Sequence, residues 1–413
     1  MPRPFTALVV GTVAGSFLMA AATTAPAAAA DETLKAVAAA YDATGRALVA
    51  ELAKSSDKNI LLSPYSIGTA MAMALSGARG ATEQDMAKVL KLTMPGPEMR
   101  EANAQLIAAL NGLGKAASGG NAAPIKLDVA NALFVAGKDN LVSRDYVALV
   151  HDKFAAEVFA GVDLAAINGW VKQKTEGKID KLLDQVSPDA VAMLLNAVYF
   201  KAPWATPFNK DQTEDNTFNL SADRQIKVPM MQRTGPYAAV AGDGFNAIRL
   251  PYADQTLSMI VAVPTAIDGL AAASERLDAA AVTKLAIVLA KDAGRQITLS
   301  LPRFKATYEA DLIQPFKQMG MSLPFDPLKS DFAGITGQQN SEGVLTISQI
   351  KHKAVVEVAE EGTEAAASTS VEILARSARA RPEEFAVDRP FLFFIVDDST
   401  GTVLFEGRIV DPR

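Results

Sequence analysis

The sequence of 413 residues contains no cysteine and only two histidines. Without cysteine the chain can form neither a disulfide nor a lipid-modified cysteine anchor, so the packed core must hold the fold. Two histidines without cysteine are too few for a typical zinc site, and we expect neither metal nor cofactor. The formal net charge of −6 provides no basic surface for nucleic acid.

The first 30 residues contain a long apolar stretch with a single charged residue before it. Arg3 precedes an apolar stretch from Ala7 to Ala21, and small residues continue to Ala30. This pattern is typical of a secretory signal peptide cleaved between Ala30 and Asp31. An uncleaved anchor is the alternative, but the apolar run is short and interrupted by glycine. We therefore expect a secreted or periplasmic protein with no membrane partner.

The segment 31–413 is expected to form a single domain. Hydrophobic residues make up 49% of the whole sequence, enough for a large core. The weak linker candidate at 117–124 is short enough to be a loop, so no linker divides the segment.

Helical patterns dominate the first half of the chain. Ser63 and Pro64 are typical of a helix start, and 67–75 is apolar on all sides, which predicts a buried helix. Thr82 is the expected cap of the following helix. The other expected helices cover 31–52, 309–319 and a segment from Leu164 to near Gly177.

Strand patterns dominate the second half. The run 191–204 is apolar around Asn196, which predicts a central strand buried on both faces and a hydrogen-bonded asparagine. Helices first and strands later indicate an α+β fold rather than a repeating βαβ pattern. The other expected strands are 127–136, 226–232, 247–252, 256–264, 296–304, 344–358, 391–398 and 402–410.

The segment 357–391 joins two unlike kinds of sequence. Its first part alternates with a period of two, and a basic run with Arg376, Arg379 and Arg381 follows. These residues suit both an exposed loop and a strand inserted into a sheet that accepts only small side chains; a linker or a helix surface is the simpler alternative. One face of the alternating part contains Thr363, Ala365, Ala367, Thr369, Val371 and Ile373.

A series of motifs follows along the chain after the signal peptide. They are 59-NILLSPYSI-67, 77-GARGATEQDM-86, 131-NALFV-135, 168-NGWVKQKTEGKI-179, 194-LLNAVYFKAPW-204, 228-VPMM-231, 301-LPRFK-305, 360-EEGTEAAAS-368, 390-PFLFFI-395 and 404-LFEGRIVDP-412. In order and spacing these motifs resemble those of inhibitory serpins over essentially the whole length after the signal peptide, and bacterial secreted serpins in particular. The resemblance implies the serpin fold, in which a helical cluster packs on a large central β-sheet, with two smaller sheets and an exposed reactive loop at about 360–389.

The resemblance also implies a mechanism. A serpin presents its loop as bait, and the protease that cleaves it is caught as an acyl-enzyme while the loop inserts into the central sheet. The family's scissile residue lies fourteen positions beyond the hinge glycine, which gives Arg376 with Ser377 on the leaving side, and Arg379 is the alternative. Arginine there suits a trypsin-like protease. The hinge would consist of Glu360, Glu361, Gly362, Thr363, Glu364, Ala365, Ala366, Ala367 and Ser368.

The resemblance places Ser63, Ser66, Asn196 and His352 in one polar cluster where the sheet opens, and Trp204 at the top of the sheet. From sequence alone, His352 and Trp204 are simply core residues. These roles are structural rather than catalytic. Heparin-dependent serpins carry a basic helix, whereas 97–115 is not basic, so we expect no heparin activation.

Two other functions stay open. The SxxK patterns at 55–58 and 348–351 suggest a serine hydrolase of the penicillin-binding type, but such short patterns arise by chance and no S-D-N motif occurs. A non-inhibitory serpin acting as a carrier or chaperone is the second, and the small residues of the hinge argue against it. We expect a monomeric inhibitor of a trypsin-like serine protease that is not an enzyme.

Overall fold

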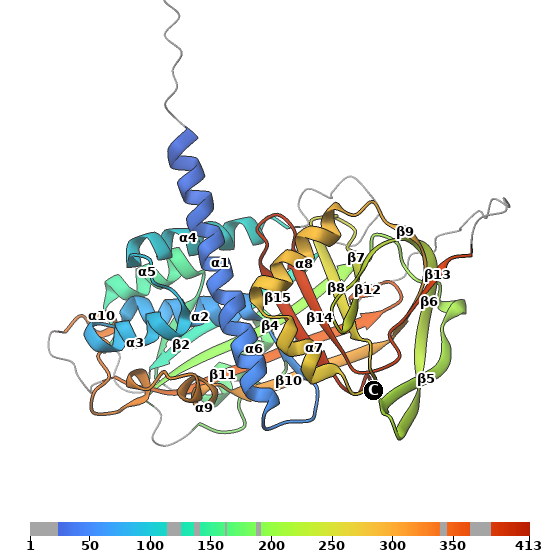
Figure 1. The fold of residues 1–413 in the computed structure, drawn as a ribbon. Coiled ribbons are helices and arrows are strands. Elements are labelled where there is room, and N and C mark those ends of the chain that lie inside the picture. Colours follow the sequence, from blue (N-terminus) through green and yellow to red (C-terminus); the bar gives the residue numbers. More distant parts are fainter. Residues whose placement is uncertain are drawn as a thin grey trace, which may run out of the picture.

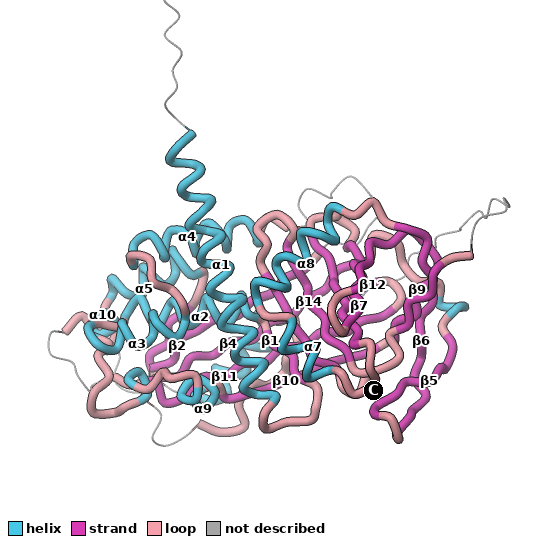
Figure 2. The backbone as a smooth tube through the Cα atoms, viewed as in Figure 1, coloured by secondary structure: helices cyan, strands magenta, loops and turns pink. Residues whose placement is uncertain are grey.

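A computed structural model describes residues 24–113, 125–135, 141–161, 163–186, 191–338, 345–363 and 381–413. Figure 1 shows most helices gathered at one end of the molecule and most strands at the other. The backbone tube in Figure 2 shows the same division. The arrangement agrees with the expected helical cluster on a large sheet.

The helix α2 (Pro64–Gly77) follows its sequence signals. Ser63 caps it, because the Ser63 side chain accepts a hydrogen bond from the Ser66 backbone N–H at 3.2 Å. Every residue of α2 is buried, as its apolar surface predicts. The remaining helices are α1 (Thr24–Ala53), α3 (Gly80–Leu90), α4 (Gly96–Leu110), α5 (Arg144–Phe154), α6 (Leu164–Lys174), α7 (Leu270–Arg276), α8 (Ala279–Lys291), α9 (Ile313–Gln318) and α10 (Ala333–Thr336), with short 3-10 turns at Lys210–Gln212 and Leu323–Phe325.

The central sheet contains six described strands in the order β10-β11-β12-β4-β2-β3. Strand β4 is buried along nearly its whole length, as predicted. It pairs antiparallel with β2 and parallel with β11. The strands are β2 (Lys126–Val135), β3 (Glu157–Ala160), β4 (Ala192–Pro203), β10 (Phe304–Asp311), β11 (Ile347–Ala359) and β12 (Gly362–Thr363).

The two smaller sheets that we expected share one long strand, β6. It pairs with β5 and β9 through one part of its length and with β7 through the other, so nine described strands form one connected sheet. The strands are β1 (Ile60–Leu62), β5 (Glu214–Ser221), β6 (Arg224–Ala241), β7 (Phe245–Pro251), β8 (Leu257–Pro264), β9 (Arg295–Pro302), β13 (Glu383–Ala386), β14 (Phe391–Asp397) and β15 (Val403–Ile409).

The two sheets share a hydrophobic core with the helices. Phe200 of β4 contacts Phe405 of β15, with ring centroids 5.8 Å apart. Because these rings come from different sheets, the central sheet is packed directly against the second one.

Two local predictions are wrong. The helix expected over 309–319 begins only at Ile313, because Glu309 belongs to β10 and lies opposite Lys353 of β11. Pairing with β11 selects the strand in a segment where the sequence also permits helix. Thr82 does not cap α3, which begins at Gly80; its hydroxyl instead accepts a hydrogen bond from the Asp331 backbone at 2.9 Å.

The helix α1 begins at Thr24, within the segment expected to be the signal peptide. Cleavage after Ala30 stays a prediction. No helix in the described ranges is long and apolar enough to cross a membrane.

Candidate functional site

The predicted hinge is described as far as Thr363. Gly362 and Thr363 form β12, which lies between β11 and β4 at one end of the central sheet. The Thr363 side chain is fully buried, and its hydroxyl hydrogen-bonds the Tyr252 phenol at 2.8 Å. The hinge therefore begins as a strand of the central sheet, with Thr363 facing inward.

Gly362 is required by its backbone conformation. Its φ is +149°, a value that side chains disfavour, and a Cβ atom there would lie 2.2 Å from the carbonyl oxygen of Ala202. Any other residue at this position would separate the hinge from β4.

Charged partners hold the two hinge glutamates. The Glu360 carboxylate pairs with Arg303 and accepts a hydrogen bond from the Thr213 hydroxyl at 2.8 Å. Burial alone would raise the pKa of Glu360, but the hydrogen bonds from Arg303 and Thr213 lower the pKa overall. Glu361 pairs with Lys210. Both glutamates are thus tied to other segments of the chain.

Trp204 lies beside the hinge at the same end of the sheet. Its backbone N–H donates to the Glu361 carbonyl at 3.0 Å, and its indole Nε1 donates to the Ala359 carbonyl at 3.0 Å. Its ring stacks on Tyr252, with centroids 4.7 Å apart and planes 12° apart. The indole therefore joins β11 and the hinge to the packed core.

A buried polar cluster crosses the interface between β4 and β11. His352 and Asn196 lie opposite each other in the strand register, and His352 Nδ1 bonds Asn196 Oδ1. Asn196 Nδ2 donates to Ser66 Oγ and to Asn131 Oδ1. Of the four predicted residues, Ser66, Asn196 and His352 are directly linked, and Ser63 joins them only by capping the Ser66 backbone.

Asn131 of β2 completes this cluster and was missed by sequence reasoning. It is buried opposite Asn196 on the neighbouring strand. The signal was present, because 131-NALFV-135 places an asparagine in an otherwise apolar strand, and a buried asparagine requires a partner.

The buried environment fixes the protonation state of His352. Burial lowers its pKa to about 3, so the imidazole is neutral at pH 7. Because Asn196 Oδ1 accepts from Nδ1, the proton resides on Nδ1. His352 Nε2 is buried without a hydrogen-bond partner within the described ranges. The arrangement is suited to holding two strands together rather than to proton transfer.

A sequence profile described as "Serpin (serine protease inhibitor)" matches residues 39–412. The chain belongs to the serpin family. Serpins are protease inhibitors rather than enzymes, and they typically bind serine proteases. This agrees with the non-enzymatic character expected from the sequence.

Individual relatives resemble this serpin over most of its length. A serpin-like protein of Thermococcus kodakarensis is 33% identical, covering 89% of this chain and 83% of its own. Human glia-derived nexin is 34% identical, covering 86% and 88%. The crystal structure of tengpin, a thermophilic serpin in its native state, matches with a TM-score of 0.80 at 27% identity, covering 92% and 94%.

Several predicted site residues lie outside the described ranges. They are the hinge residues Glu364, Ala365, Ala366, Ala367 and Ser368, the predicted reactive bond between Arg376 and Ser377, and the alternative scissile residue Arg379. Arg381 is the first described residue after this segment and is exposed. The roles of these residues stay predictions.

The serine-hydrolase patterns form no nucleophilic arrangement in the described ranges. The Ser348 hydroxyl donates to the Ala192 carbonyl and accepts from the Val191 backbone, both at 3.0 Å. Ser55 donates to the Leu52 carbonyl at 3.2 Å. Neither hydroxyl is hydrogen-bonded to a lysine or a histidine that could act as its base. Within these ranges, no group of three acidic or histidine side chains could hold a metal.

Proposed function

We propose that this serpin inhibits trypsin-like serine proteases as a suicide substrate. The protease cleaves between Arg376 and Ser377 and remains acylated by Arg376 while the loop inserts between β4 and β11. The observation that best supports this proposal is β12, since Gly362 and Thr363 already lie between these two strands.

The register of β12 indicates how many loop residues could insert beside β4. Thr363 lies opposite Ala202, and the pairing is antiparallel. If this register continued, Ile373 would lie opposite Ala192, because each is ten residues beyond its starting partner. Ala192 is the first residue of β4. The strand-like segment recognised in the sequence therefore matches the length of β4.

The side chains of this segment suit the inner face of the sheet. Residues two apart share a face, so those at odd positions from Thr363 to Ile373 would follow Thr363 inward. All of them are small or apolar, which avoids burying charge. In the same register Thr369 would lie opposite Asn196, which places a hydroxyl beside the buried polar cluster.

The bait residue defines the protease class. An arginine side chain suits a specificity pocket with an acidic residue at its base. From Thr363 to Arg376 an extended strand would span about 45 Å at ~3.3 Å per residue. Full insertion would therefore carry an attached protease to the far end of the sheet. A signal peptide over 1–30 would bring the inhibitor to secreted or periplasmic proteases.

Incubation with trypsin tests the proposal. We expect a complex that survives SDS, together with a C-terminal fragment whose mass shows that it begins at Ser377. Arg376→Ala should abolish the complex, while the matched Arg379→Ala variant should retain it. A fragment that begins at Ala380 would instead identify Arg379 as the scissile residue.

The same experiment separates inhibition from a carrier or chaperone role. A non-inhibitory serpin would be cleaved in its loop without trapping the protease. Complete cleavage with free, active trypsin would contradict the inhibitory proposal.

A further inference from the structure

A pocket of about 460 Å³ opens beside Trp204, at the end of the central sheet where the hinge lies. This volume is within the range of small-molecule sites. The aromatic residues Trp204, Phe208 and Tyr237 line it, together with Arg233 and Arg249. No carboxylate is among the described residues that line it. The walls thus combine aromatic residues with two arginines, of which Arg249 is paired with Asp398.

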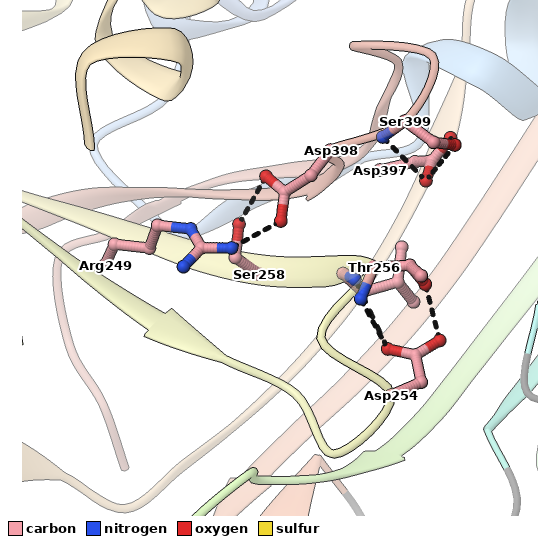
Figure 3. A network of polar contacts seen from close by, with 8 residues as sticks. Arg249, Asp254, Thr256, Ser258, Asp397, Asp398 and Ser399 are labelled. Atoms are coloured by element: carbon pink, nitrogen blue, oxygen red, sulfur yellow. Dashed lines mark hydrogen bonds and ion pairs between the residues drawn. The ribbon is translucent and has the colours of Figure 1, made fainter. Parts of the chain in front are cut away.

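Arg249 is held by an ion pair with Asp398. Figure 3 shows its guanidinium facing Asp398, to which Nη2 donates at 2.5 Å, while Ser258 donates to the other Asp398 oxygen at 3.0 Å. Arg249 Nε is buried and has no hydrogen-bond partner within the described ranges. Because this nitrogen is closed off from solvent and the guanidinium is already paired with Asp398, Arg249 forms part of the pocket wall, and Arg233 is the cation left for a ligand.

Arg233 lies over two aromatic rings. Its Nε donates to the Tyr237 hydroxyl at 2.7 Å, and its Cζ lies 4.7 Å from the Tyr237 ring centroid and 6.0 Å from that of Phe208. Arg233 forms no ion pair with any of the described residues. A stacked guanidinium keeps its in-plane donors available for a planar anion.

Trp204 connects this pocket to the hinge. Trp204 lines the pocket with the 3% of its surface that is exposed, while its backbone and indole N–H groups donate to the carbonyls of Glu361 and Ala359. A ligand that contacts the ring would therefore restrict a residue that holds the hinge in place.

We propose that the pocket binds a small aromatic carboxylate, with its ring among the aromatic walls and its negative group against Arg233. Bound ligand stabilises the observed position of Trp204 and slows insertion of the loop. This second effect rests on the proposed inhibitory function; binding itself does not.

Titration calorimetry of the full chain with 2-naphthoate tests the site. One molecule should bind per chain, and neutral 2-naphthamide, which has a similar shape, should bind at least tenfold more weakly. Equal affinity for the two compounds would contradict a charge-directed site. Arg233→Gln should weaken naphthoate about tenfold, equivalent to about 1.4 kcal/mol, and Arg233→Lys should recover part of the loss.

A second pocket provides the matched control. A space of about 450 Å³ between α1 and α8 is lined by Lys35, which is also cationic. Lys35→Gln should leave naphthoate binding unchanged. If Lys35→Gln removes binding and Arg233→Gln does not, the assigned location is wrong.

The two tryptophans report the location without altering the site. The Trp170→Phe variant assigns the two indole N–H resonances in NMR spectra. In the wild type, naphthoate should shift the Trp204 resonance and leave Trp170 unmoved, because Trp170 packs among Phe134 and Phe159. An unmoved Trp204 resonance at saturating naphthoate would exclude the site, even if Arg233→Gln failed to fold.

Coupling to the hinge is measured with trypsin. Saturating naphthoate should at least double the number of serpin molecules cleaved for each protease trapped, because slower insertion gives the acyl-enzyme more time to hydrolyse. Trypsin mixed with naphthoate in the absence of the serpin is the control for direct effects of naphthoate on the enzyme. An unchanged ratio would contradict the coupling. If no trypsin is trapped without ligand, the proposed inhibitory function fails, while the binding result stands.

Discussion

Strands β4 and β11 meet in two different ways along their length. From Ile347 to Val355, β11 pairs directly with β4, whereas at the hinge end β12 separates the two strands. Figure 1 shows β12 near this end of the sheet. At the hinge end, β4 and β11 are therefore each hydrogen-bonded to β12 instead of to one another.

The comparison shows what opening the paired section would require. The one interface between β4 and β11 would be replaced by two interfaces with the inserted strand, so the main-chain groups of β4 and β11 keep partners and those of the inserted strand gain them. The bond between His352 and Asn196 crosses the paired section and has no main-chain substitute. Side chains therefore distinguish the two sections: charge and aromatic contacts hold the hinge end, and a buried polar cluster holds the paired section.

The largest effect is expected from Thr363→Arg, which alters the first inward residue of the inserting segment. Thr363 is fully buried, so arginine would place a charge inside the sheet or keep the hinge out of it. We expect trypsin to cleave the variant without forming an SDS-resistant complex. The measurement is the ratio of complex to cleaved serpin on a gel.

Thr307→Arg is the matched control. Thr307 lies on β10 of the same sheet but is exposed. The variant should trap trypsin like the wild type. Normal inhibition by Thr363→Arg would refute the inward orientation of the loop.

The second prediction concerns the paired section and pH. The folded pKa of His352 is about 3, against about 6.5 in an unfolded chain, so between these values only the unfolded state binds the proton. Stability is therefore lost as pH falls from about 6.5, by up to about 1.4 kcal/mol per pH unit. In His352→Gln, the free energy of unfolding should no longer show this decrease below about pH 6.5.

The chain provides a control in its only other histidine. His151 has 81% of its side chain exposed, and His151→Gln should keep the wild-type slope. Urea titrations at pH 7.0, 6.0 and 5.0 measure the free energies of unfolding. Parallel slopes for the wild type and both variants would show that His352 is not the buried neutral group described here.

The third prediction compares two neighbouring glutamates. Glu360 is buried and bonded to Arg303 and Thr213, whereas Glu357 faces Lys305 at 3.4 Å in a largely exposed pair. Glu360→Gln should lower the free energy of unfolding by about 2 kcal/mol, because hydrogen bonds to a buried charge are lost.

Glu357→Gln should cost less than about 1 kcal/mol, as exposed ion pairs do. The lowered pKa of Glu360 adds a further test, because the stability that it contributes is present above its unfolded pKa near 4.5 and is lost as pH falls through the lower folded value. The difference between the two variants should therefore shrink below about pH 4. Equal losses for the two variants at pH 7 would mean that the hinge end is held by other contacts.

Sequence reasoning recovered what is encoded locally. The buried helix α2 followed from its cap and its apolar surface on all sides, and β4 followed from an apolar run around Asn196. The polar cluster itself was predicted only through resemblance to serpins, since His352 and Asn196 are separated by 156 residues. No local pattern indicates which distant strand an asparagine faces.

The contacts of the hinge could not be predicted in this way. Glu360 pairs with Arg303, which lies 57 residues earlier in the chain. From the sequence, both side chains would be expected on the surface. The hinge sequence suits an exposed loop and an inserted strand equally well. It therefore does not indicate that β12 lies between β4 and β11. Strand β10 was missed in part because residues 309–319 also fit a helix, and only pairing with β11 decides between them.

The smallest effect is expected from tryptophan substitutions that differ in one hydrogen bond. Trp204 donates its indole N–H to the Ala359 carbonyl at 3.0 Å, whereas the buried Trp170 indole N–H has no partner within the described ranges. Phenylalanine removes a similar ring area at both sites, but only at Trp204 does it leave a carbonyl without its donor. Trp204→Phe should therefore lower the free energy of unfolding by about 1 kcal/mol more than Trp170→Phe. Urea titration of both variants measures the difference, and a larger loss for Trp170→Phe would show that ring packing, rather than the bond to β11, makes Trp204 hold the hinge end.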